Sequence, residues 1–278
     1  MLLSFNPPAR DGIRQRPRGR LLPCIAGLVL SFSLRAQIPA THKQGTSHGF
    51  LVVKSAEGKI IGVGDQIQII RGNEVRSRLV LHFNDGSVDD EVSIFSQNST
   101  FQLISDHHVQ KGPSFPQPLD LTIDVARHKA TWVETKDNKK QTKTEEMDLP
   151  PSLANGMISL AVQNFPAKAT ELALPYAAGT SKPRIVKLIV TPDGHEELNL
   201  HGFKRTSTRF NLHVDIGGVL GVAAKVTGKQ PEDIKVWVYE GDAPTFLRMR
   251  GALYQGGPIW TTELSAPTWV QDNPSGRK

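Results

Sequence analysis

The stretch from Arg76 to Lys111, RSRLVLHFNDGSVDDEVSIFSQNSTFQLISDHHVQK, constrains the fold more than any other part of the chain. Apolar and polar residues alternate along it, which is the pattern of β-strands with one buried face. Asp85-Gly86 and Asn98-Ser99-Thr100 interrupt the alternation and are typical of tight turns. We therefore expect three antiparallel strands in a row, with one face packed on the core and the other partly exposed to water.

The Asp85-Gly86 pair predicts which residues face each other in the first hairpin. If these two residues form the whole turn, Asn84 pairs with Ser87 and the register of both strands follows. A buried carboxylate needs a partner or takes up a proton, whereas one near the end of the sheet reaches water. Asp90 is the charged residue on the face predicted to be apolar, so it is either a buried carboxylate or one that reaches water near the end of the sheet. It would share this face with Leu79, Leu81, Phe83, Val88, Val92 and Ile94.

The densest group of side chains able to do chemistry lies in the same stretch. The opposite face of the hairpin would pair His82 with Asp89, next to Glu91. His107 and His108 are consecutive on the third strand, so they point to opposite faces and cannot both bind one metal from a regular strand. The candidate site residues are therefore His82, Asp89, Asp90, Glu91, His107 and His108, with Asp106 beside them.

Two interpretations fit this polar group. Imidazole and carboxylate side chains together can hold a divalent metal or act as acid and base. A solvated sheet face with favourable cross-strand charge pairs would contain the same residues. The run 195–199, HEELN, has Asn199 where a zincin needs its second histidine. We assign no catalytic residue, no metal site and no cofactor from the sequence.

Residues 1–36 have the composition of an export signal. They contain six arginines and one aspartate, and so carry five of the six net positive charges of the chain. Arg14–Arg20 precedes the apolar run Leu21–Leu34, and Ala36 offers a small residue for cleavage, which is the order found in secretory signal peptides. The apolar run is short for a membrane-spanning helix, although an uncleaved anchor is the alternative. We expect a secreted or periplasmic protein.

The positions of the charged residues and of the cysteine exclude several classes of function. Because the basic residues belong to the leader, the rest of the chain carries a net charge near +1, and we expect no nucleic-acid partner. Cys24 is the only cysteine and lies in the leader, so a cleaved chain would have no disulfide and no thiol nucleophile. Contact with a membrane is expected only through an uncleaved leader.

The remainder of the chain predicts a mainly β (α+β) fold. We expect a large curved antiparallel sheet or half-barrel, with one or two helices packed on it at Leu153–Phe165 and Gly217–Lys229. We predict a flexible arm at residues 37–48, a single β-rich domain at 49–264 and a loose tail at 265–278. An arrangement in two lobes that meet near 150–180 is an alternative. Pro192-Asp193-Gly194 predicts a turn between the strands Arg184–Thr191 and Glu196–Leu200.

The phrases DEVSIFSQNSTFQLISDHHVQKGPSFPQPLDLTID and GGPIWTTEL carry a family resemblance. With the strand order and the leader, they resemble uncharacterised secreted bacterial β-rich families, domains of unknown function with a half-barrel similar in shape to lipoprotein carriers. The resemblance implies a concave sheet able to hold an apolar ligand, and it transfers no residue role.

Two functional hypotheses follow. The first is an exported, non-enzymatic cell-envelope protein that binds a lipid, an apolar small molecule or another envelope protein. The second is a metal-assisted or acid/base hydrolase built on the His82, Asp89 and His107 region. The two differ in whether these side chains converge in a cleft.

Overall fold

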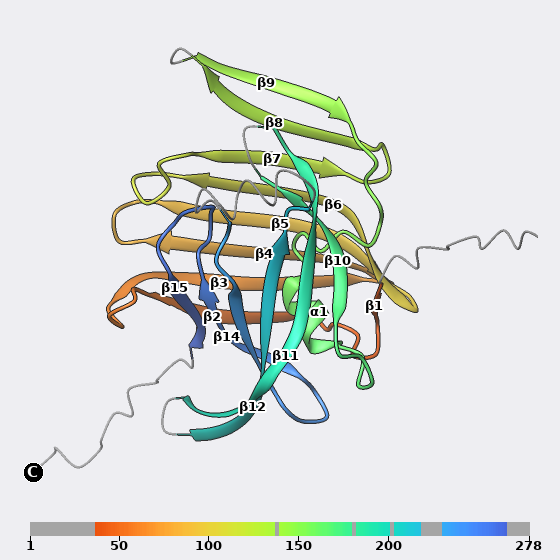
Figure 1. Ribbon diagram of the computed structural model, residues 1–278, viewed down its shortest axis with the longest axis vertical. Helices are drawn as coiled ribbons and strands as arrows, with labels where there is room; N and C mark the ends of the chain where they lie inside the picture. The colour runs from red at the N-terminus through yellow and green to blue at the C-terminus, as the bar shows by residue number, and fades with distance from the viewer. Residues whose placement is uncertain (1–36, 137–138, 180–181, 201–202, 218–229, 266–278) are drawn as a thin grey trace, which may run out of the picture. The chain divides into compact units, whose positions relative to one another are not determined.

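The computed structural model describes residues 37–136, 139–179, 182–200, 203–217 and 230–265, all within one compact unit. The expected signal peptide, residues 218–229 of the expected second helix and all of the expected tail after Ser265 lie outside the described residues. Within them, no helix has the length and hydropathy that a membrane-spanning helix needs. The strands of the described residues belong to one antiparallel sheet that is curved and does not close on itself (Figure 1).

The sheet is built from two meanders. The first comprises β2 to β9 and the second β10 to β15, and β15 pairs with β2 to join them. The short β1 adds to β6. The strands are β1 (Ile38–Pro39), β2 (Ser47–Lys54), β3 (Ile60–Arg71), β4 (Glu74–Phe83), β5 (Val88–Gln97), β6 (Thr100–Lys111), β7 (Leu119–Asp124), β8 (Lys129–Lys136), β9 (Lys139–Glu146), β10 (Leu172–Ala178), β11 (Arg184–Leu200), β12 (Phe203–Asp215), β13 (Ile234–Tyr239), β14 (Thr245–Gly251) and β15 (Trp260–Ser265).

The strand order explains where the helical segment lies. Because β9 and β10 are at opposite ends of the strand order, the connection between them crosses one face of the sheet, which we call the inner face. Leu149, Leu153, Met157 and Leu160 of this connection are at most 1% exposed and belong to the main core. The same core contains Phe95, Leu103 and Leu121 from the inner face.

The helix in this connection is shorter than the sequence pattern indicates. The apolar spacing predicts a helix over Leu153–Phe165, but α1 spans Ile158–Gln163. Gly156 has a φ of 63°, a left-handed conformation that ends any helix started before it. The preceding Asn155 bonds through its side-chain amide to both the N–H and the C=O of Ala177 on β10, at 2.8 and 3.0 Å. The first residues of the expected helix therefore cover the free edge of β10 instead.

The register of the β4–β5 hairpin also differs from the prediction. A two-residue type I′ turn needs a positive φ at both Asp85 and Gly86, and only Gly86 has one, at 83°. The loop has three residues, because the N–H of Phe83 donates to the C=O of Ser87 at 2.9 Å. This shifts β5 by one residue, which exchanges its two faces. The expected pairing of His82 with Asp89, and the expected inward position of Asp90, are wrong.

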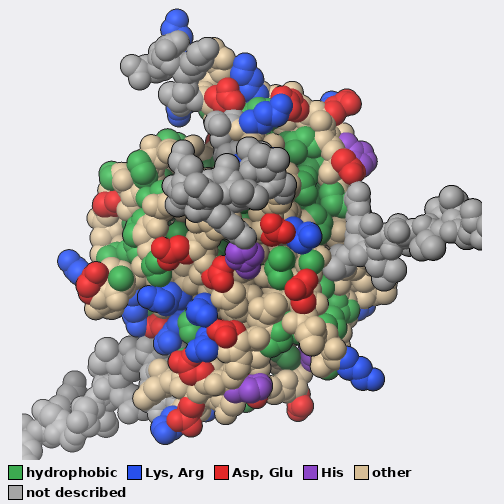
Figure 2. Space-filling model, in the orientation of Figure 1, with side chains coloured by type: hydrophobic (Ala, Val, Ile, Leu, Met, Phe, Trp, Pro, Cys, Tyr) green, Lys and Arg blue, Asp and Glu red, His purple; other side chains and the backbone are tan. Residues whose placement is uncertain are grey.

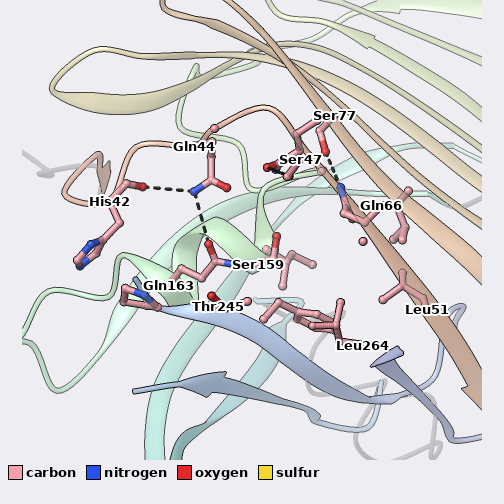
Figure 3. Close-up of a pocket in the computed structure, with 18 of the residues that line it drawn as sticks. His42, Gln44, Ser47, Leu51, Gln66, Ser77, Ser159, Gln163, Thr245 and Leu264 are labelled. Atoms are coloured by element: carbon pink, nitrogen blue, oxygen red, sulfur yellow. Dashed lines mark hydrogen bonds between the residues drawn. The ribbon is translucent and has the colours of Figure 1, made fainter. Parts of the chain in front are cut away.

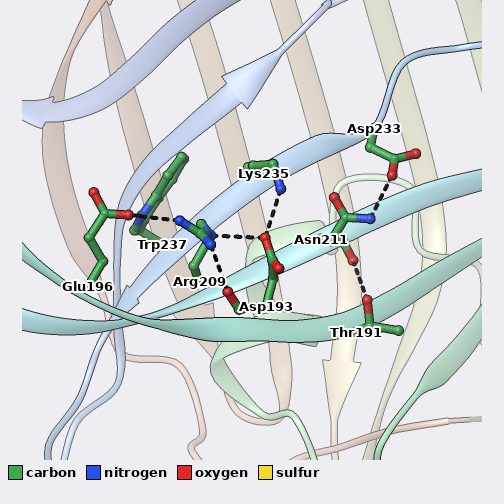
Figure 4. A network of polar contacts seen from close by, with 8 residues as sticks. All are labelled: Thr191, Asp193, Glu196, Arg209, Asn211, Asp233, Lys235 and Trp237. Carbon is green, nitrogen blue, oxygen red and sulfur yellow. Dashed lines mark hydrogen bonds and ion pairs between the residues drawn. The ribbon is translucent and has the colours of Figure 1, made fainter.

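The expected turn at Pro192-Asp193-Gly194 is a bulge inside one long strand. β11 continues to Leu200, and its pairing with β12 shifts between Pro192 and His195. The bulge is held from the neighbouring strands: Arg209 Nε lies 2.9 Å and Lys235 Nζ 2.7 Å from Asp193 Oδ2 (Figure 4). Figure 2 shows basic and acidic side chains side by side on the face it presents, in keeping with such ion pairs.

The segment expected to be a flexible arm is attached to the domain. Ile38 is fully buried and pairs with Phe101 of β6. The N–H of His42 donates to Asn164 Oδ1 at 2.6 Å, at the end of α1. Ser47 and His48 already belong to β2. Residues 38–48 therefore reach the inner face of the sheet beside α1.

Candidate functional site

A cavity of about 640 Å³ lies between the inner face of the sheet and α1. Its size is within the range of small-molecule sites, roughly 300–1,000 Å³. We call it the inner cavity. Strands from both meanders line it, including β2 and β15, which meet at the junction of the two. Leu51 and Leu264 are paired across that junction, and both line the cavity (Figure 3).

Apolar and neutral polar side chains make up most of the lining of the inner cavity, which also contains the titratable residues His42, Lys43, His48, Glu91 and Asp242. The apolar residues are Leu51, Leu79, Ile158, Val236, Ala243, Pro244, Phe246, Met249 and Leu264. The neutral polar residues are Gln44, Ser47, Gln66, Gln68, Ser77, Ser93, Ser159, Gln163, Thr245 and Thr262. A molecule with one apolar part and one hydrogen-bonding part would match both kinds of surface.

Residues 42–49 form one wall of the inner cavity, and hydrogen bonds fix this wall in place. The backbone of Gln44 exchanges two bonds with the side chain of Gln97 on β5, at 2.7 and 3.2 Å. The side-chain Nε2 of Gln44 lies 3.5 Å from Gln163 Oε1 on α1 (Figure 3). The wall is thus connected to the sheet on one side and to the helix on the other.

Glu91 is the charged side chain that β5 places in the cavity wall, next to Ser93 and Gly156. The backbone of Gly156 favours the ionised form of the carboxyl group of Glu91, but its effect on the pKa is smaller than that of burial. Burial, and to a smaller degree the nearby charge of Asp89, raises the pKa of Glu91 above its usual value. The carboxyl group is therefore held in an environment that disfavours its negative charge.

Asp106 lies behind this wall on β6 and is 1% exposed. Its Oδ1 accepts a hydrogen bond from Ser93 Oγ at 2.7 Å. Its Oδ2 is buried and has no hydrogen-bond partner among the described residues. Burial, together with the charge of Glu91, raises the pKa of Asp106 to about 8. Asp106 and Glu91 thus form a pair of carboxyl groups that resist losing both protons.

His108 and Asp89 form an ion pair in the same cluster. His108 Nε2 lies 2.6 Å from Asp89 Oδ1, and Gln110 Nε2 lies 3.3 Å from Asp89 Oδ2. Burial alone would lower the pKa of His108, but the hydrogen bond and charge of Asp89 outweigh it and raise this pKa to about 9. The imidazole of His108 is therefore protonated at neutral pH and is held against Asp89.

A second cavity of about 300 Å³ borders the other side of this cluster. His108, Gln110 and Tyr176 line it. Burial raises the pKa of Tyr176 well above its usual value. The acidic cluster, which we define as Asp89, Glu91, Asp106 and His108, therefore separates two cavities.

The structure divides the six candidates that the sequence singles out. It brings Asp89, Glu91 and His108 together on the inner face. The other three, His82, Asp90 and His107, lie on the outer face, as the corrected register requires. There, two nitrogens of Arg78 lie 2.8 and 2.9 Å from the carboxylate oxygens of Asp90, and this contact lowers the pKa of Asp90.

His107 contacts Asp120 at 3.1 Å on the outer face, so the two consecutive histidines point in opposite directions, as expected. Ser93 and Gly156 are not among the candidate residues that the sequence pattern indicates. Ser93 could have been found from the alternation 89, 91, 93 once the loop length was known, whereas no local signal places Gly156 beside it. Among the described residues, no group of three or more His, Cys, Asp or Glu side chains is placed to hold a metal ion.

Comparison with known proteins gives fold neighbours only. No family model matches the chain, and no curated protein matches it. One similar solved structure is the hypothetical lipoprotein YmcC from Escherichia coli K12, at 12% identity and a TM-score of 0.36, covering 84% of this chain and 91% of that one. Another is a β-barrel-like protein of the domain of unknown function DUF1849 from Brucella abortus, at 11% identity and a TM-score of 0.44, covering 79% and 95%.

The description of the first neighbour calls it hypothetical, and that of the second names a domain of unknown function. Both identities are low and both TM-scores are below 0.5, so neither protein lends this chain a ligand, a partner or a residue role.

Proposed function

We propose that the protein is an exported cell-envelope protein that binds an amphipathic small molecule, of the lipid class, in the inner cavity without transforming it. The observation that carries the proposal is the inner cavity itself, in which apolar side chains and neutral amides and hydroxyls line one space. The export part rests on the leader, residues 1–36.

The chemistry of the lining supports a lipid-like ligand. Each methylene group that moves from water to an apolar wall contributes about 0.8 kcal/mol, so a short alkyl chain could supply most of the affinity. The side-chain amides of Gln44 and Gln163 offer hydrogen-bond donors and acceptors for a head group (Figure 3). Binding groups of this kind orient a ligand without needing a reactive residue.

The test is native mass spectrometry of the full chain purified from its own envelope, followed by organic extraction of bound lipid. A recurrent bound mass that is extracted as one lipid class supports the proposal, and a clean unbound mass contradicts it. Ser159→Trp would place an indole in the inner cavity and should abolish the bound mass. Ser96→Trp, on the outer face of β5, is the matched control and should retain it.

One observation favours a second candidate, an acid/base enzyme. Glu91 and Asp106 both have raised pKa values beside a cavity, which suits a carboxyl group that donates a proton. A hydrolase of this kind would use these two residues with His108, since His82 and His107 lie on the outer face. Turnover of model esters or glycosides that is lost in Glu91→Gln and in Asp106→Asn would favour the enzyme over the binding protein.

A further inference from the structure

We propose that the ligand of the inner cavity carries a cationic nitrogen group, which the carboxylate of Glu91 receives. This rests on the proposed binding function and specifies the class of ligand. Glu91 lines the inner cavity beside Ser93 and Gly156, so a ligand in the cavity would meet its carboxyl group.

The charges around Glu91 leave room for one more cation. On the two strands concerned, Asp89, Glu91 and Asp106 are acidic and His108 is the one basic group facing them. His108 is already paired with Asp89 at 2.6 Å. Tyr176, which also faces the cluster, is neutral at ordinary pH. Among the described side chains of this cluster, His108 is therefore the one cation for three carboxyl groups, and Glu91 and Asp106 share it with Asp89.

The covering segment cannot supply a further cation. Residues 149–165 pack over this part of the inner face and contain no Asp, Glu, Lys, Arg or His. Asp106 provides an independent observation. Its Oδ2 is buried and has no hydrogen-bond partner among the described residues. Other charged residues in the cavity wall, such as Lys43 and Asp242, are exposed at its rim.

A cation at Glu91 would change the protonation of the cluster. In the free protein, burial raises the pKa of Glu91 and raises that of Asp106 to about 8, so both carboxyl groups favour the protonated form more than usual. A positive charge beside Glu91 would favour its ionised form, so a proton would leave for solvent as the ligand binds. Binding of a cationic ligand should therefore release protons, while a neutral ligand of the same length should release none.

The experiment compares decylammonium, decanol and decanoate, measured by isothermal titration calorimetry on the full chain at neutral pH. Decylammonium should bind about tenfold or more tightly than decanol, since hydrogen bonds to charged groups are the stronger kind. In Glu91→Gln this preference should disappear while decanol binding stays unchanged. Asp242→Asn, at the exposed rim, is the matched control and should keep the preference.

The outcomes are distinct. If no compound binds, the proposed function fails and the cation site fails with it. If decylammonium and decanol bind equally, the cavity binds amphiphiles but the cation site is wrong. A preference that survives Glu91→Gln and vanishes in Asp242→Asn assigns the cation to the rim and overturns the proposal. Should Glu91→Gln not fold, proton release by the wild-type protein in buffers of different ionisation enthalpy decides: release with decylammonium alone supports the site, and no release overturns it.

Discussion

The carboxylates of Asp89 and Asp90 are consecutive on β5 and make their ion pairs on opposite faces of the sheet. Asp89 pairs with His108 inside, where the two side chains are 9% and 18% exposed. Asp90 pairs with Arg78 outside, where they are 27% and 48% exposed. The two neighbours thus form a natural comparison between a buried and an exposed ion pair.

Asp89→Asn should destabilise the protein by about 3 kcal/mol at pH 7, because it leaves a buried imidazolium without its partner. Asp90→Asn removes an equal charge from the outer face, where water screens the pair, and should cost less than about 1 kcal/mol. Urea unfolding of both variants measures the difference. Equal losses would mean that the inner pair is not protected from solvent.

Stability should decline as pH rises from 4 to 9, owing to the acidic cluster. The pKa of Asp106 is raised from 3.8 to about 8, so its stabilisation is complete below pH 4 and is lost as the pH approaches 8. The pKa of His108 is raised from 6.5 to about 9, so its contribution is complete below pH 6.5 and is lost as the pH passes through about 9.

The free energy of unfolding, measured in urea between pH 4 and 9, tests this pH dependence. Each group contributes at most about 1.4 kcal/mol per pH unit. Asp106→Asn should flatten the decline below pH 8, and His108→Gln should flatten it between 6.5 and 9. Variants whose curves run parallel to the wild-type curve would show that other groups cause the dependence.

Gly156→Ala should be strongly destabilising, by about 3 kcal/mol. An added Cβ would lie 1.6 Å from Ser93 Oγ, and the φ of 63° is unfavourable for alanine. Gly58→Ala is the matched control, since Gly58 has a φ of 83° and no atom within 4 Å of an added Cβ. It should cost about 1 kcal/mol from backbone strain alone. Thermal unfolding of both separates the steric contribution from the backbone contribution.

Asn155→Ala should loosen the edge of β10. It leaves the buried N–H and C=O of Ala177 without partners, at an expected cost of about 3 kcal/mol. Hydrogen exchange should show faster exchange of the Ala177 amide. Asn211→Ala removes a solvent-exposed hydrogen bond between β12 and Asp233 and serves as the control, with an expected loss below about 1 kcal/mol. An unchanged exchange rate at Ala177 would mean that Asn155 does not hold this edge.

The strands were predictable because alternation and turn residues are local signals, as in β4, β5 and β6. The length of the loop at Asp85-Gly86 was not, since a single glycine suits both a two-residue and a three-residue loop. That one residue decides whether Asp89 or Asp90 lies on the inner face of the sheet. The sequence therefore locates the candidate residues on β4, β5 and β6, but it places the side chains of β5 on the wrong faces of the sheet.

Features that depend on distant residues could not be read from the sequence. Pro192-Asp193-Gly194 has the composition of a turn, yet Arg209 and Lys235 hold it within a strand. The orphaned oxygen of Asp106 likewise depends on how residues 149–165 cover β6. Local propensity yields to tertiary contacts at both places.

The pairing of β15 with β2 has a kinetic consequence. It joins residues as far apart as Lys54 and Glu263, 209 positions along the chain, whereas the strands within each meander pair with their neighbours in sequence. Closing so long a loop costs conformational entropy, so we expect this pairing to form last. Because Leu51 and Leu264 of this pair line the inner cavity, a partly folded chain would have no place for the ligand. A bound ligand should then slow unfolding without speeding the collapse of either meander.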